Sequence, residues 1–93
     1  MARRASKVDA THAEIVQVFR CAGWPVLSLA AVGHGCPDLL VYGATALWLI
    51  EIKSGPKART LRATAKKQAV FAQRFPVVRL DSAVSAADWI VSQ

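Results

Sequence analysis

The stretch from Gly33 to Gly55 constrains the fold most, because it predicts two strands joined by a short turn. Residues 38–42 and 47–53 are rich in branched and aromatic side chains, which favour β-structure. The intervening Gly43-Ala44-Thr45-Ala46 segment predicts a four-residue loop. The chain is therefore expected to contain an antiparallel hairpin near its middle.

The register of this predicted hairpin brings charged side chains together. If the loop closes tightly, Tyr42 faces Leu47, and counting outward places Asp38 opposite Glu51, with Cβ atoms about 5 Å apart. Side chains alternate along a strand, so Lys53 shares the face of Glu51. Facing like charges destabilise a sheet unless a positive charge lies between them. Mg²⁺ suits this pair, because it commonly takes one or two carboxylates and fills its other positions with water and substrate phosphate.

A simpler interpretation of the same residues stays open. Glu51 and Lys53 would then be ordinary residues on the exposed face of an edge strand, and Asp38 would only open a strand after a proline. The Leu-Trp-Leu-Ile segment at 47–50 argues against this, since it is too apolar for an edge strand.

Length and composition predict one small domain covering residues 1–93, with a flexible basic arm at 1–7. An apolar fraction of 54% that includes many alanines leaves little margin of stability, so association into a homodimer would help. Trp24, Trp48 and Trp89 are candidates for the partner surface. No apolar run approaches the ~20 residues needed to cross a bilayer. The basic start leads to no apolar signal core, which predicts a cytoplasmic protein.

The net charge of +6 comes from twelve lysines and arginines against six acids. An excess of this sign favours a polyanionic partner such as DNA, although a merely solvated surface would also explain part of it. The predicted phosphate contacts are Arg3, Arg4, Lys57, Arg59, Arg62, Lys66 and Lys67.

Periodicity and turn residues predict the remaining elements. Helices are expected from about residue 8 or 11 to 22, from 61 or 64 to 74, and from 82 to 92, with further strands at 26–31 and 77–80. The predicted order is α-β-β-β-α-β-α, an α/β fold. Cys21 and Cys36 have neither the spacing of a zinc site nor an oxidising context for a disulfide.

The hairpin residues resemble the PD-(D/E)xK nuclease superfamily, and the surrounding pattern is similar to its VRR-NUC branch of stand-alone bacterial or phage type. The match consists of Gly-Cys-Pro-Asp-Leu-Leu-Val at 35–41 followed by Leu-Trp-Leu-Ile-Glu-Ile-Lys at 47–53. The resemblance implies a restriction-endonuclease-like core, with a mixed central sheet flanked by helices.

The resemblance also implies roles for single residues. Asp38 and Glu51 would hold Mg²⁺ or Mn²⁺ together with the Ile52 carbonyl. Lys53 would orient the attacking water or neutralise developing charge. Two helical residues complete the set expected from similar nucleases. Glu14 would bind a water of the ion or a second ion, and Gln68 would position the water or the phosphate.

Both helical assignments have alternatives. Thr11 and Glu14 also have the spacing of a capping box, in which the glutamate only ties the start of the helix. Gln68 would be a surface glutamine, with Gln73 as the fallback for the site. The residues alone leave both questions open.

The function implied is a metal-dependent DNA endonuclease of a bacterial or phage-infected cell. Branched DNA such as a four-way junction is the expected substrate, because similar stand-alone nucleases resemble Holliday-junction resolvases and a two-fold homodimer presents two equivalent sites. The alternatives are a non-catalytic basic module that binds nucleic acid and a plain interaction domain, although the latter leaves the facing carboxylates unexplained.

Overall fold

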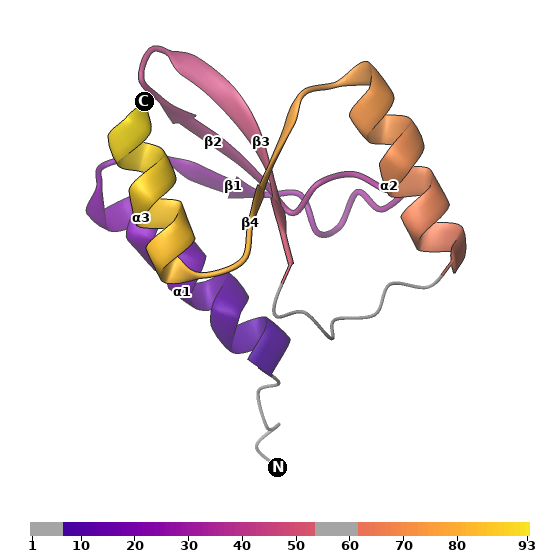
Figure 1. The fold of residues 1–93 in the computed structure, drawn as a ribbon, viewed down its shortest axis with the longest axis horizontal. Helices are drawn as coiled ribbons and strands as arrows, with labels where there is room; N and C mark the ends of the chain where they lie inside the picture. The colour runs from indigo at the N-terminus through magenta and orange to yellow at the C-terminus, as the bar shows by residue number, and fades with distance from the viewer. Residues whose placement is uncertain (1–6, 54–61) are drawn as a thin grey trace.

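The computed structural model describes residues 7–53 and 62–93, and side chains from 10 to 53 and from 66 to 93. Within these residues the element order is the predicted α-β-β-β-α-β-α (Figure 1). The elements are α1 (Lys7–Cys21), β1 (Val26–Ser28), β2 (Leu39–Gly43), β3 (Ala46–Ile52), α2 (Arg62–Arg74), β4 (Val77–Leu80) and α3 (Ala83–Ser92). The predicted phosphate contacts Arg3, Arg4, Lys57, Arg59 and the side chain of Arg62 lie outside the described part.

The four strands described form one mixed sheet in the order β1-β2-β3-β4. The first two pairings are antiparallel and the β3–β4 pairing is parallel. A parallel pair requires a long crossover, and α2 lies in that connection. β3 is paired on both sides, which explains its apolar sequence and excludes the edge-strand interpretation.

The β2–β3 hairpin has the predicted register but a tighter turn. Tyr42 pairs with Leu47 as expected, and the pairing continues to Gly43 and Ala46. The loop is therefore two residues long, and the predicted four-residue loop is wrong. Ala44 and Thr45 both have positive φ, 48° and 62°. Positive φ at both positions is typical of a type I′ turn, whose twist matches that of the flanking strands.

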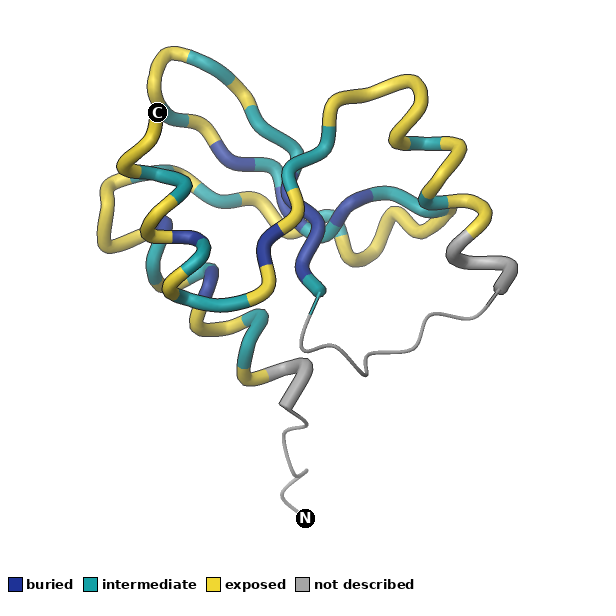
Figure 2. Tube along the Cα trace, viewed as in Figure 1, coloured by how far each residue is buried: buried dark blue, intermediate teal, exposed yellow. Residues whose placement is uncertain are grey.

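The core lies between one face of the sheet and the helix pair α1 and α3 (Figures 1 and 2). Ile15 and Phe19 of α1 are fully buried against Leu39 and Ile50 of the sheet, with Ala86 of α3 beside them. The opposite face has Glu51 at one end. Towards the hairpin turn, the same face has Leu27, Tyr42 and Leu47, which are more than half or about half exposed.

The three tryptophans are partly buried and pack against this core. The Trp89 ring lies 5.6 Å from the Trp24 ring and 5.0 Å from the Trp48 ring, with Phe19 beside them. Edge-to-face contacts at these distances stabilise the fold beyond simple area burial. Contacts within the chain thus supply much of what these rings need, and their assignment as candidate partner surface stays a prediction.

β1 is shorter than predicted, ending at Ser28 rather than at residue 31. The Leu29 N–H still donates to the Asp38 carbonyl, but the chain then turns, with the Val32 N–H donating to the Leu29 carbonyl. α1 begins at Lys7, within one residue of the earlier predicted start, so Thr11 lies inside the helix instead of at its cap. The capping-box alternative for Glu14 is thereby excluded. None of the helices in the described residues has the length and apolar character needed to cross a membrane.

Candidate active site

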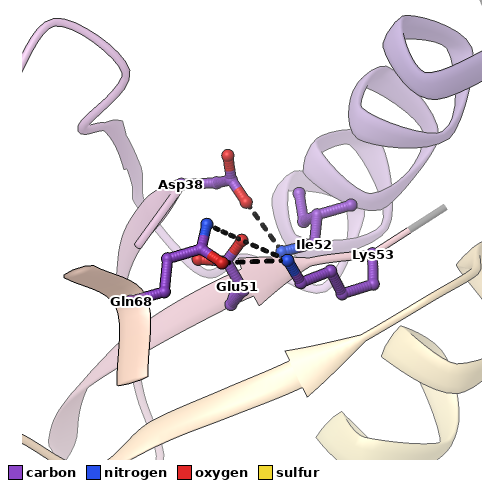
Figure 3. A network of polar contacts seen from close by, with 5 residues as sticks. All are labelled: Asp38, Glu51, Ile52, Lys53 and Gln68. Carbon is purple, nitrogen blue, oxygen red and sulfur yellow. Dashed lines mark hydrogen bonds and ion pairs between the residues drawn. The ribbon is translucent and has the colours of Figure 1, made fainter. Parts of the chain in front are cut away.

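Asp38 and Glu51 lie opposite each other on the sheet face that α1 and α3 leave uncovered. The hairpin register pairs Leu39 with Ile50, and one further step along each strand leads to the two acids. The Asp38 carboxylate accepts a hydrogen bond of 2.7 Å from the backbone N–H of Ile52 (Figure 3). This bond fixes Asp38 beside the end of β3, next to Glu51.

The Glu51 carboxyl is buried, with only 7% of the residue exposed. Burial raises the pKa of Glu51 from the usual value of 4.5 to about 7, and the negative charge of Asp38 and a hydrogen bond with it act in the same direction. The positive charges of Lys53 and Arg79 oppose that shift. The pair therefore carries an electrostatic cost that a bound cation would remove.

Lys53 and Gln68 complete a network around Glu51 (Figure 3). The Lys53 ammonium donates to Gln68 Oε1 at 3.1 Å, and Gln68 Nε2 donates to Glu51 Oε2 at 3.3 Å. The Lys53 nitrogen also lies 3.8 Å from Glu51 Oε2. The Gln68 amide of α2 thus joins the Glu51 acid of β3 to the Lys53 ammonium just after that strand. The choice between Gln68 and Gln73 falls on Gln68, since Gln73 is exposed.

A close backbone contact holds α2 at this distance. Gly33, His34 and Gly35 all have positive φ, so the loop before Pro37 winds in the left-handed sense. A Cβ added at Gly35 would lie 2.5 Å from the backbone carbon of Lys67. The loop therefore touches the helix one residue before Gln68, and only glycine permits this approach.

A hollow of about 320 Å³ adjoins the network on the side of Asp38. Its walls include His34, Lys67 and Gln68, so positive and neutral donors face the carboxylate across open space. The hollow is therefore open to a substrate group on the side of Asp38, whereas Glu51 is not among its walls.

The donor set suits a hard divalent cation. Among the described residues, no group of three or more histidine, cysteine, aspartate or glutamate side chains could hold a metal ion. Two facing carboxylates are nevertheless enough for Mg²⁺, which takes its other ligands from water, carbonyls and substrate. The burial of Glu51 beside Asp38, which raises the pKa of Glu51, favours such an ion, because a cation would stabilise the ionised form of both acids.

The structure does not bring Glu14 to this cluster. It is exposed, and it lines a separate hollow with Gln17, Cys21 and Ala83. No hydrogen bond or ion pair joins it to the acids in the described part of the chain. Its role with a second ion stays a prediction.

Arg79 was missed by the sequence analysis. It pairs with Glu51 across the parallel β3–β4 ladder, and its charge lowers the pKa of that acid. A lone charge within Val-Val-Arg-Leu at 77–80 was the available signal, because alternation places it on the face opposite Leu80. The sequence could not show that this strand lies beside Glu51.

A comparison with solved structures finds the same architecture in a chain titled "VRR_NUC domain". The two structures superpose with a TM-score of 0.65 at 22% identity, over 96% of this chain and 98% of the other. This chain has the fold of a VRR_NUC domain. The predicted restriction-endonuclease-like α/β fold is confirmed, and neither a protein-family model nor a curated protein matches the sequence.

Replacing Gly35 tests how α2 is positioned. Gly35→Ala forces a Cβ into the α2 backbone and adds the cost of positive φ. We expect a loss of about 2 to 5 kcal/mol in urea unfolding and a changed NMR signal of the Gln68 side-chain amide.

Gly33→Ala is the matched control, because Gly33 also has positive φ but a Cβ there would meet nothing within 4 Å. It should lose only about 1 to 2 kcal/mol and leave the Gln68 signal unchanged. Equal losses in the two variants, with no effect on Gln68, would show that the contact with α2 is unimportant.

The pKa of Glu51 predicts how stability depends on pH without divalent ions. Because the folded state raises this pKa from 4.5 to about 7, the acid stabilises the fold fully below pH 4.5 and progressively less up to pH 7. The wild type should therefore lose on the order of 3 kcal/mol between pH 4.5 and 8 relative to Glu51→Gln. Urea unfolding in a chelating buffer measures this difference, and parallel pH profiles would contradict the shift.

Proposed function

We propose that this protein is a metal-dependent nuclease that hydrolyses phosphodiester bonds in DNA. The observation that supports this best is the buried Glu51 carboxyl facing Asp38, joined through Gln68 to the Lys53 ammonium. An acid pair with an ammonium beside it suits hydrolysis of a phosphodiester, which needs both a cation and neutralisation of developing charge. The shared fold with a VRR_NUC domain supports the same activity.

Asp38 and Glu51 would hold Mg²⁺ or Mn²⁺, with the Ile52 carbonyl as a further ligand. The ion would supply Lewis-acid chemistry, lowering the pKa of water and polarising the phosphate. Asp38 is prepared for this task because the Ile52 N–H already orients its carboxylate. The bond uses Asp38 Oδ2, and the other carboxylate oxygen takes no part in it.

Lys53 would neutralise the negative charge that develops on the phosphate or orient the attacking water. A compact ammonium suits this role, and Gln68 holds its nitrogen at 3.1 Å. Arg79 lies on the other side of Glu51 and would contribute positive charge towards the substrate. Gln68 would position the water or the phosphate, since its amide lies between Glu51 and Lys53.

DNA is the proposed partner because the exposed surface near the acids is basic. Lys66 and Lys67 are exposed on α2, and the chain carries a net charge of +6. Branched DNA such as a four-way junction and a two-fold homodimer remain our proposal for the substrate and the assembly. The exposed apolar end of the sheet around Leu27, Tyr42 and Leu47 offers the surface for the second copy.

A cleavage assay tests the function directly. Labelled duplex, single-stranded, flapped and four-way DNAs are incubated with Mg²⁺, with Mn²⁺ or with a chelator. We expect cleavage only with the ions, and Lys53→Ala should lower its rate about 10²-fold or more while retaining most DNA affinity. Lys66→Ala is the control. Loss of a phosphate contact should weaken DNA binding and reduce the slope of log affinity against log salt concentration by about one.

Calorimetric titration with Mg²⁺ separates this function from its rival. The wild type should bind the ion, and Asp38→Asn should not. DNA binding without ion binding or cleavage would favour the non-catalytic nucleic-acid-binding module. Unchanged turnover in Lys53→Ala would remove the proposed role of that ammonium.

The proposed assembly has its own test in Leu47. This residue is 66% exposed, so Leu47→Lys should leave the fold intact while placing a charge in the proposed interface. Light scattering should show a dimer mass for the wild type and a monomer mass for the variant. Paired, symmetric nicks across a four-way junction should become single nicks, whereas a monomeric wild type would contradict the homodimer.

A further inference from the structure

One flank of α2 has an apolar groove that the network around Glu51 does not use. The groove has a volume of about 380 Å³. We call it the α2 groove, and it is lined by His34, Lys66, Lys67, Val70, Phe71, Arg74 and Phe75. Phe75 is 47% exposed, and its ring lies 4.7 Å from that of Phe71 at an angle of 33°. Two aromatic rings thus present apolar surface to the solvent.

The charges of the α2 groove have one sign. Lys66, Lys67 and Arg74 are exposed cations along about 12 Å of helix, and His34 approaches from the loop. No acidic residue is among those that line the groove. Cations that surround aromatic rings suit a ligand with both negative charge and a flat apolar face.

The groove borders the hollow beside Asp38. His34 and Lys67 line both spaces, and the hollow reaches Asp38 and Gln68. A chain-like ligand that lies on α2 and extends past His34 and Lys67 would therefore reach Asp38. Its charge and its path match those of a nucleic-acid strand.

A second copy of the chain fits the groove poorly, because each copy carries a net charge of +6 and would face the same cations. An intact duplex also uses the rings poorly, because its bases are paired and stacked on one another. An unpaired nucleotide exposes its base for stacking on an aromatic ring, and its phosphate remains available to lysine and arginine.

We propose that the α2 groove binds an unpaired nucleotide of the DNA substrate beside the bond to be cut, with its base on the Phe75 ring. Lys66, Lys67 and Arg74 contact the adjoining phosphates. This inference rests on the proposed nuclease function and narrows the proposed branched DNA to forms with a single-stranded segment at the site, such as a flap, in place of a fully paired four-way junction. It gives α2 two tasks, since Gln68 contacts the acid network and the flank that lines the groove binds the strand.

The test measures binding in a chelating buffer, so that cleavage does not take part. One probe is a blunt DNA hairpin, and the other is the same hairpin with an overhang of about four nucleotides. Phe75→Leu keeps an apolar side chain but removes the ring. It should weaken binding of the overhang probe about tenfold and leave the blunt probe unchanged, since stacking of one base contributes about 1 to 3 kcal/mol.

Fluorescence from 2-aminopurine in the overhang gives a second measurement. The wild type should change this fluorescence on binding, because the base stacks on a protein ring, and Phe75→Leu should not. Val91→Ala is the matched control, as Val91 is a largely exposed apolar residue on α3, away from the groove. It should behave like the wild type with both probes.

Two outcomes would overturn the inference. Equal weakening of both probes by Phe75→Leu would show that the ring does not distinguish unpaired bases. A change from dimer to monomer mass in that variant would show that the groove joins two copies of the chain. Binding is measured without metal ions and is therefore independent of cleavage. A protein that prefers the overhang probe but does not cleave DNA would support strand binding in the α2 groove and contradict only the nuclease function.

Discussion

The site depends on one constraint, that Asp38 and Glu51 face each other across the β2–β3 hairpin. The two acids are neighbours because the hairpin register leaves them no other place, and burial under α2 raises the pKa of Glu51 to about 7. A stable sheet would ordinarily avoid such a pair. We propose that the pair at the end of this interior strand holds a cation, whose charge would offset the repulsion between the two acids.

The two faces of the sheet have different roles, since one carries the apolar core and the other carries the acids. On one face, α1, α3 and the tryptophan cluster supply the apolar contacts that stabilise a short chain. On the other face, α2 covers only the acidic end, and the loop at 33–35 sets its distance. Because the core is confined to one face, the other can hold buried charge and open hollows without loss of the main apolar packing.

The position of α2 links the acid network to the surface where a strand would bind. Gln68 contacts Glu51 and Lys53, and Lys66, Phe71 and Phe75 of the same helix line the groove. A shift of this helix would therefore change both the geometry at the acids and the path of the substrate. The close contact at Gly35 fixes the position of α2, and so fixes the acid network and the groove relative to each other.

The sequence by itself determined the element order, the hairpin register and the acid pair. Side-chain alternation and turn residues act over a few positions, so local pattern alone places Asp38, Glu51 and Lys53 on one face of the sheet. The two-residue turn escaped prediction because Ala44 and Thr45 both adopt positive φ, which neither residue type favours.

Only the tertiary structure decided which distant residues join that pair. Gln68 and Arg79 reach Glu51 because a parallel β3–β4 pairing carries α2 over the sheet, and no local pattern encodes that crossover. The same packing placed the tryptophans against the core and left Glu14 in a separate hollow. Local periodicity fixes the face of an element on which a side chain lies, whereas packing of whole elements decides what that face meets.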